Sequence, residues 1–197
     1  MRFVWLQVMV LLSAPVLGQG TWQLVKTGPS VTVYTKQKPE SEYRSFKAVG
    51  IVLSTPEKVL EVLDDVYHYK QWFAFSKSIR LLKRKPNEKY VYMETSLPWP
   101  FRNQDMIYKI TVRKNNPGEI KLILNGRSNF IPAIDGIQRM YDAKGYILLQ
   151  PKQDYTIVTY VMHTEFGGDI PPWLANTYIH LLPFQTLNNL KGIVEKM

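Results

Sequence analysis

The sequence predicts an α+β fold in which a curved antiparallel β-sheet wraps around a long C-terminal helix. Two predicted strands are followed by a helical pattern, then by a series of short alternating strands joined by turn signals, and finally by an apolar helical pattern. A sheet with so many strands must curl, and one helix that arrives last can pack across its concave face. We expect this arrangement to enclose a hydrophobic cavity between the sheet and the helix.

The two opening strands are predicted at Val31–Gln37 and Tyr43–Leu53, joined by a polar turn that contains a proline. Six later segments alternate in the same way and are joined in pairs by turns at residues 86–87, 115–118 and 153–154. In chain order these segments are SIRLLKRK, KYVYMETS, MIYKITVRK, EIKLILNG, QRMYDAKGYILLQP and YTIVTYVMHTEF. Short strands separated by turn signals are typical of an antiparallel meander.

The first helix is predicted directly after the second strand. Ser54 and Glu57 match a capping-box pair, and Pro56 fits the first turn of a helix, where a missing N–H costs nothing. Hydrophobic residues then recur at helical spacing at Val59, Leu60, Leu63 and Val66. We expect the helix to continue or to break near residues 67–72.

The last element is predicted as a helix over Pro172–Lys196. Gly167 and Gly168 precede it and allow backbone angles that other residues resist, so the chain can leave the last strand sharply. Pro172 fits the first turn of the helix. Pro183 lies inside the predicted helix and removes one backbone hydrogen bond, so we interpret it as a hinge in a lid.

Residues 1–20 have the layout of a secretory signal peptide. A single positive charge at Arg2 precedes an apolar run from Phe3 to Leu12, and small residues follow at the positions that a signal peptidase requires. The run is shorter than the ~20 apolar residues that a transmembrane helix needs, and Gln7 and Pro15 interrupt it. We therefore expect cleavage of this segment, which leaves residues 21–197 as a single domain.

The composition narrows the compartment and the partners. The chain has no cysteine and a formal net charge of +9 at pH 7. An exported domain of this size without disulfides favours a bacterial periplasm. We expect no nucleic-acid partner for an exported monomer of this kind. The positive charge favours transient contact with anionic membrane surfaces, although scattered charges also serve simply to keep a surface soluble.

Four stretches of the sequence resemble a known family. They are TPEKVLEVLDDVYHYKQW, PWPFRNQDMIYKI, GYILLQP with the strand after it, and GGDIPPWLANTYI leading to PFQTLNNLK. On these residues the chain resembles a START (StAR-related lipid-transfer) domain of the bacterial secreted kind, within the helix-grip superfamily. The resemblance covers nearly the whole of residues 21–197. It implies that one lipid or other hydrophobic molecule binds in a cavity between the sheet and the C-terminal helix.

The strand pattern and the resemblance together give a set of candidate ligand-binding residues. One face of the last strand carries Val158, Tyr160 and Met162, and we expect this face to line the cavity. Leu174, Tyr178 and Leu181 share the inward spacing of the last helix. The full set of candidate residues is Glu94, Trp99, Phe101, Arg102, Asp105, Tyr108, Leu124, Met140, Tyr160, Met162, Trp173, Leu174, Tyr178 and Leu181.

Three of these candidates are polar, and we expect them to contact a ligand near the cavity mouth: Glu94, Arg102 and Asp105. The middle motif departs from the family pattern, because relatives usually carry Arg-Asp where this chain has Gln104-Asp105. Among the aromatic residues, Trp99 and Phe101 are expected at the rim of the cavity and Trp72 in the core. The position of Trp173 fits either place equally well.

The sequence predicts no catalytic, metal or cofactor site. No two of the three histidines have the spacing of metal ligands, and the chain lacks HExxH, GxSxG and glycine-rich phosphate-loop motifs. His163 shares a strand face with Glu165. A pair of this kind can transfer protons, but it is far more often a solvated surface pair.

Three functions remain open at this point. The first, which we favour, is a non-enzymatic carrier or sensor that holds one hydrophobic ligand in the periplasm. The second is a cyclase-like or other enzyme that acts on a hydrophobic or aromatic substrate in the same cavity, with His163, Glu94 or Tyr108 exchanging protons. The third is an interaction module of the cell envelope whose core is filled and has no room for a ligand.

Overall fold

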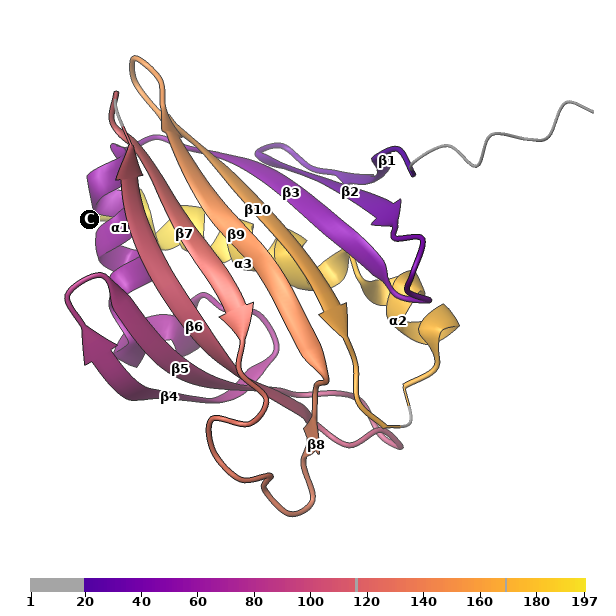
Figure 1. Ribbon diagram of the computed structural model, residues 1–197. Helices are drawn as coiled ribbons and strands as arrows, with labels where there is room; N and C mark the ends of the chain where they lie inside the picture. The colour runs from indigo at the N-terminus through magenta and orange to yellow at the C-terminus, as the bar shows by residue number, and fades with distance from the viewer. Residues whose placement is uncertain (1–19, 116, 169) are drawn as a thin grey trace, which may run out of the picture.

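Ten strands form one sheet in the computed structural model (Figure 1), which describes residues 20–115, 117–168 and 170–197. Nine of them follow the order β1-β2-β3-β10-β9-β7-β6-β5-β4, and each neighbouring pair is antiparallel. The tenth, β8, makes a short parallel contact with β6. The strands are β1 (Gln23–Thr27), β2 (Val31–Gln37), β3 (Arg44–Val52), β4 (Ser76–Lys85), β5 (Glu88–Thr95), β6 (Gln104–Asn115), β7 (Glu119–Gly126), β8 (Gln138–Arg139), β9 (Asp142–Pro151) and β10 (Thr156–Glu165).

The predicted α+β fold is confirmed: a curved antiparallel sheet packs against a C-terminal helix. Each predicted strand is present to within a few residues, and the segment from residue 138 to 151 divides into β8 and β9. Strand β1 was not predicted from the sequence. Its side chains are mostly exposed and show no alternation, so the strand is defined by its pairing with β2 at the edge of the sheet.

The inward face of β10 is the one that the sequence predicted. Val158, Tyr160 and Met162 are buried, whereas the side chains between them are partly exposed. β10 lies between β3 and β9 near the centre of the sheet and keeps an unbroken register with both. Because successive side chains of a strand point to opposite faces, this register fixes which residues of the neighbouring strands face inward.

Helix α1 spans Pro56–Asp64, and Pro56 is its first residue, as predicted. The predicted capping box is wrong by one residue. The cap is Thr55, whose Oγ1 accepts a hydrogen bond from the Lys58 backbone N–H at 3.5 Å. Proline at the first helical position places the cap on the residue immediately before it. A 3₁₀-helix, η1 (Val66–Gln71), follows α1, so the chain breaks where the sequence analysis expected.

The single C-terminal helix predicted over residues 172–196 is two helices, α2 (Pro172–Tyr178) and α3 (Leu181–Val194). Pro183 is the third residue of α3. It has no N–H to donate to the carbonyl of residue 179, so the helical hydrogen bonds stop there and start again when Phe184 N–H donates to His180 O at 3.3 Å. Pro183 therefore marks the start of a second helix rather than a kink inside one.

The sharp exit from β10 depends on its two glycines. Gly168 has a φ of +68°, a left-handed conformation that other residues rarely adopt. A Cβ added to Gly167 would lie 2.1 Å from the carbonyl oxygen of Arg139, so only glycine fits there. Pro172 then begins α2, as expected.

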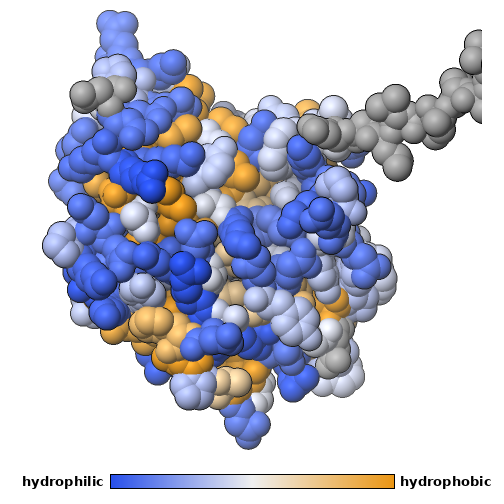
Figure 2. Space-filling view, viewed as in Figure 1, coloured by the Kyte–Doolittle hydropathy of each residue, from blue (hydrophilic) through white to orange (hydrophobic). Residues whose placement is uncertain are grey.

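Helix α3 runs across one face of the sheet, behind the strands in Figure 1, and packs on β2, β3 and α1. Its buried side chains include Leu187, Leu190 and Val194. The opposite face of the sheet, which we call the outer face, is turned toward the viewer. It is mainly hydrophilic, and hydrophobic side chains gather near its lower end, over the loop that leads to β8 (Figure 2). Within the described residues, no helix is both long and apolar enough to cross a membrane.

Candidate ligand cavity

An apolar cavity lies between the inner face of the sheet and the segment formed by the end of α1, η1 and the residues after it. Its walls come from that segment and from β5, β6, β7, β9 and β10. The lining residues are Leu63, Tyr69, Trp72, Phe73, Met93, Tyr108, Ile110, Leu122, Leu124, Ile147, Tyr160 and Met162. The sequence predicted that the C-terminal helix would form one wall of the cavity. Residues 63–73 form that wall instead, and the lining contains no residue of α3.

Helix α3 supports this segment from behind. The Asn189 side-chain amide donates a hydrogen bond to the Trp72 carbonyl at 3.2 Å. The Ala74 backbone N–H donates to Thr186 Oγ1, also at 3.2 Å. Trp72 itself is only 3% exposed, as predicted for a core residue. The wall that faces the sheet is thus held in place by two side chains of the last helix.

The cavity in this conformation is small. Its volume is about 30 Å³, whereas an apolar cavity that holds one benzene molecule measures about 150 Å³. An alkyl chain longer than a few carbons can enter only if the walls separate. The candidate site is therefore a closed form of a cavity that must expand.

Three tyrosines are the titratable groups of the cavity wall: Tyr69, Tyr108 and Tyr160. Burial raises the pKa of each phenol well above its ordinary value, and the neighbouring Tyr108 and Tyr69 raise that of Tyr160 further. The Tyr69 hydroxyl donates to the Leu63 carbonyl. These groups stay protonated at neutral pH, so each can act as a hydrogen-bond donor.

A buried cation lies behind the cavity wall and was not anticipated from the sequence. Lys89 Nζ donates to the Leu63 carbonyl at 2.6 Å and to Asp64 Oδ1 at 3.0 Å, and Arg84 Nη1 donates to Asp64 Oδ2 at 2.7 Å. Burial lowers the pKa of Lys89, against the opposing effect of Asp64. The signal in the sequence was the position of Lys89, which alternates with Val91 and Met93 on the inward face of β5.

Four of the predicted ligand-binding residues lie in the cavity wall: Tyr108, Leu124, Tyr160 and Met162. Met140 belongs to the hydrophobic core but does not line the cavity. That any of these residues contacts a ligand stays a prediction. The cavity wall also contains Tyr69, Trp72 and Phe73, which were not among the predicted ligand-binding residues. They follow a helix whose end the sequence pattern does not define.

The predicted polar contacts Glu94 and Asp105 lie on the outer face of the sheet. Each is adjacent in its strand to an inward core residue, Met93 and Met106, so its side chain points the other way. The two acids face each other across β5 and β6 in register. Their predicted contact with a ligand in the cavity therefore has no support from this geometry.

Both acids already have partners on the outer face. Glu94 Oε1 accepts a hydrogen bond from the Asn103 side-chain amide at 2.7 Å and lies 3.3 Å from Lys77 Nζ. Asp105 forms a two-pronged ion pair with Arg139. Arg102 Nη2, the third predicted polar contact, donates to Gln138 Oε1 at 3.0 Å. The contacts of Asp105 and Arg102 tie the outer face to the segment around β8.

The remaining candidates lie outside the described cavity wall. Trp99 is 92% exposed in the loop between β5 and β6, and Trp173 and Tyr178 are 69% and 56% exposed on α2. Phe101, Leu174 and Leu181 are half-buried. The prediction that Trp99 and Phe101 form a rim around the mouth stays open, because the cavity is closed in this conformation.

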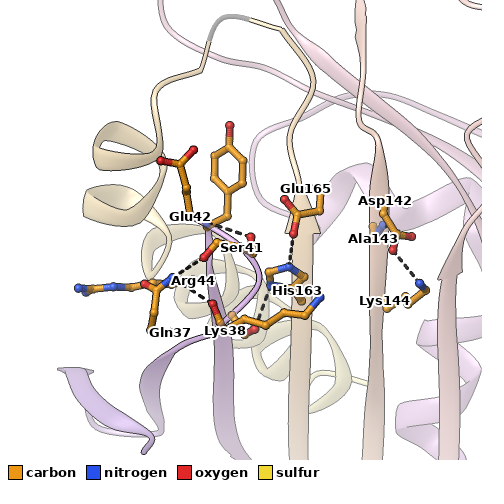
Figure 3. Close-up of polar contacts among 12 residues, drawn as sticks. Gln37, Lys38, Ser41, Glu42, Arg44, Asp142, Ala143, Lys144, His163 and Glu165 are labelled. Atoms are coloured by element: carbon orange, nitrogen blue, oxygen red, sulfur yellow. Dashed lines mark hydrogen bonds and ion pairs between the residues drawn. The ribbon is translucent and has the colours of Figure 1, made fainter. Parts of the chain in front are cut away.

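His163 and Glu165 form the pair that the sequence suggested, and it also lies on the outer face, on the opposite side of β10 from Met162. Their Nε2 and Oε1 atoms are 2.7 Å apart (Figure 3). Ser45 Oγ lies 3.0 Å from the other ring nitrogen. Burial raises the pKa of Glu165, but hydrogen bonds from Ser41 and His163 lower it overall. Among the described residues, no three metal-binding side chains come together.

The sequence matches the family model of the START domain over residues 7–196. It is 31% identical to the uncharacterized protein PA1579 of Pseudomonas aeruginosa, over 89% of this chain and 87% of that one. A solved STAR-related lipid transfer protein from Xanthomonas axonopodis is 34% identical, with a TM-score of 0.83 over 88% of this chain and 98% of that fragment. The Zhui aromatase/cyclase of a Streptomyces species shares the fold alone, at 14% identity and a TM-score of 0.52, over 78% of this chain and 94% of that one.

Proposed function

The chain belongs to the START domain family, and on this premise we propose that it holds one lipid or other hydrophobic small molecule in the cavity and does not transform it. It would serve as a carrier or sensor of that ligand. The observation that supports this proposal most directly is the apolar cavity, whose walls come from five strands and from residues 63–73. The relative from Xanthomonas axonopodis is described as a lipid transfer protein, which supports the same class of ligand.

Burial of a hydrocarbon supplies enough free energy for this role. Each CH₂ removed from water contributes about 0.8 kcal/mol, so a chain of roughly fifteen carbons gains on the order of 12 kcal/mol when it is fully enclosed. A shallow groove would lose much of this gain. A carrier must therefore close around its ligand and open to release it, and the walls of the cavity, which is small in this structure, must move apart for a ligand to enter.

The chemistry of the cavity wall favours binding over catalysis. Of the three groups proposed to exchange protons in an enzyme, His163 and Glu94 lie on the outer face of the sheet, and Tyr108 alone faces the cavity. Burial raises the pKa of Tyr108, which makes its phenolate inaccessible as a base at neutral pH. The aromatase/cyclase that shares the fold does not by itself assign such a reaction to this chain.

We also propose that the protein acts outside the cytoplasm, as a monomer in a bacterial periplasm. Export is supported by the signal-peptide pattern of residues 1–20, of which residues 1–19 lie outside the described part of the chain. Transient contact with an anionic membrane would deliver and collect the ligand. The net positive charge and the exposed aromatic rings of Trp99, Trp173 and Tyr178 support such contact.

Lipid extraction tests the ligand class. Residues 21–197 are purified under native conditions, extracted with organic solvent and analysed by mass spectrometry, beside a mock purification from cells without the protein. We expect one class of hydrophobic molecule to co-purify at close to one per protein. Repeated recovery of an empty protein that also fails to take up labelled lipids from vesicles would contradict the proposal.

A further inference from the structure

The cavity wall contains hydrogen-bonding groups that no described part of the protein satisfies. Trp72 Nε1 is buried without an acceptor. The hydroxyls of Tyr108 and Tyr160 also form no hydrogen bond with any described residue, although both side chains line the cavity. Tyr69, in the same wall, is different, because its hydroxyl donates to the Leu63 carbonyl. Three polar groups are therefore left over in an otherwise apolar wall.

A buried polar group without a partner is uncommon, because it loses its hydrogen bonds to water without replacement, and Trp72 Nε1 is such a group. At the two tyrosine positions a phenylalanine would fill nearly the same volume without a polar group. The indole N–H can only donate, and a phenol whose pKa is raised by burial stays protonated and so keeps its O–H to donate. The three groups together match a ligand that carries a hydrogen-bond acceptor.

The acceptor on the ligand should be uncharged. None of the residues that line the cavity is a lysine, arginine or histidine. The buried cation nearest to the wall, Lys89, has its ammonium 5.4 Å from the Tyr69 ring centroid and already donates to Leu63 and Asp64. A carboxylate or phosphate would enter the cavity without a counter-charge, which is costly in an apolar interior.

We propose that the cavity selects a hydrophobic ligand with a single uncharged acceptor group, such as a ketone, ester or alcohol oxygen, and that Trp72, Tyr108 and Tyr160 supply the donors that hydrogen-bond to it. This inference rests on the proposed ligand-binding function and adds the chemical class of the ligand. The walls must separate for any alkyl chain to enter, and that movement brings the indole N–H and the two phenols into contact with the ligand. A pure hydrocarbon would fill the same space but leave all three groups unsatisfied.

The test compares three probes with the same number of carbons: undecane, methyl nonyl ketone and undecanoate. Each is titrated into residues 21–197 labelled with ¹⁵N, and binding is followed by the indole N–H resonances, with that of Trp72 assigned from the Trp72→Phe variant. We expect the ketone to bind about tenfold more tightly than undecane, in line with one net hydrogen bond. We also expect the Trp72 indole proton to shift downfield with the ketone only.

Variants separate this proposal from the one on which it rests. Tyr108→Phe and Tyr160→Phe should each weaken binding of the ketone about three- to tenfold and leave undecane unchanged, which also shows that the variants are folded. Tyr90→Phe is the matched control, because Tyr90 stacks on Phe130 on the outer face. Equal affinity for undecane and ketone, or tightest binding of undecanoate, would overturn the proposal about the acceptor. Failure of all three probes to bind would instead contradict the ligand-binding function itself.

Discussion

Arg139 donates from Nε and Nη2 to the two carboxylate oxygens of Asp105, at 2.6 and 3.1 Å. The Asp105 side chain is almost completely buried, and the same guanidinium donates to the carbonyls of Ser128, Ile131 and Pro132. One arginine thus fixes the loop between β7 and β8 onto the outer face of β6. The acid that the sequence assigned to a ligand is therefore a structural anchor for a loop.

Replacing Arg139 should destabilise the protein and release this loop. Arg139→Met leaves the buried carboxylate of Asp105 without a counter-charge, so we expect a loss of about 3–5 kcal/mol in the free energy of unfolding. Arg139→Lys keeps the charge but loses the two-pronged geometry, and an intermediate loss is expected. Urea denaturation measures both values, and trypsin should cut after Arg127 faster in both variants.

Arg113→Met, at an exposed site on β6, is the control, and its free energy of unfolding should stay within about 0.5 kcal/mol of the parent protein. A loss in this control as large as that in Arg139→Met would contradict the role assigned to Arg139.

The burial of Asp105 also explains why Glu94 and Asp105 were predicted from the sequence to contact a ligand in the cavity. β5 and β6 each contain four consecutive buried residues, 91–94 and 104–107, because the sheet packs on the cavity side and the loop before β8 covers the other side. A strand that is buried on both faces has no alternation that could reveal its inward face. β10 has one buried and one partly exposed face, so its cavity residues could be predicted from the sequence. The contacts of Arg139 join segments far apart in the chain, which no local pattern reports.

The ion pair between buried Lys89 and half-exposed Asp64 should respond unequally to loss of either partner. Lys89→Met leaves no polar group without a hydrogen-bond partner, because the Leu63 carbonyl still accepts from Tyr69 and Asp64 still accepts from Arg84. We expect its free energy of unfolding to stay within about 1 kcal/mol of the parent protein. Asp64→Asn leaves the buried ammonium of Lys89 without its carboxylate and should cost about 1–3 kcal/mol. Urea denaturation compares the two variants, and a larger loss for Lys89→Met would contradict this account.

Stability should fall at alkaline pH in part because of the three phenols that line the cavity. The folded pKa values of Tyr69, Tyr108 and Tyr160 lie above the ordinary value of 10.0, so above that pH the unfolded chain releases protons that the folded protein keeps. Lys89 changes the stability in the opposite direction, because its pKa is lowered in the folded protein. Its contribution to the pH dependence ends near the ordinary pKa of 10.5. Above that pH we expect a loss of about 4 kcal/mol per pH unit from the three phenols.

Single substitutions measure how much each phenol contributes to this loss of stability per pH unit. Tyr108→Phe should reduce the slope by about 1.4 kcal/mol per pH unit, measured as the free energy of unfolding in urea between pH 10 and 11.5. Tyr67→Phe is the control, since Tyr67 is 80% exposed, and it should leave the slope unchanged. If the Tyr108 variant keeps the full slope, its phenol ionises equally in the folded and unfolded states and the burial argument fails.

Contact with membranes should depend on the exposed tryptophans. Trp99→Ser and Trp173→Ser each remove an aromatic ring that a lipid interface would bury, so we expect several-fold weaker binding to vesicles that contain anionic lipid. Sedimentation of vesicles measures the bound fraction, and Tyr67→Ser, at another exposed aromatic site, is the control. Binding that is unchanged in both tryptophan variants, or that does not weaken with added salt, would contradict the proposed contact.

The break between α2 and α3 gives the hinge hypothesis for Pro183 a specific location. Pro183→Ala restores an N–H that can donate to the carbonyl of residue 179, so α2 and α3 could join into one continuous helix. A continuous helix would resist the movement that separates the cavity walls, because α3 holds the segment around Trp72. We expect exchange of a fluorescent lipid between the loaded protein and vesicles to slow several-fold, while the free energy of unfolding changes by about 1 kcal/mol or less. Pro39→Ala, in the exposed turn between β2 and β3, is the control. Exchange at the parent rate in the Pro183 variant would mean that this proline only sets where α3 begins.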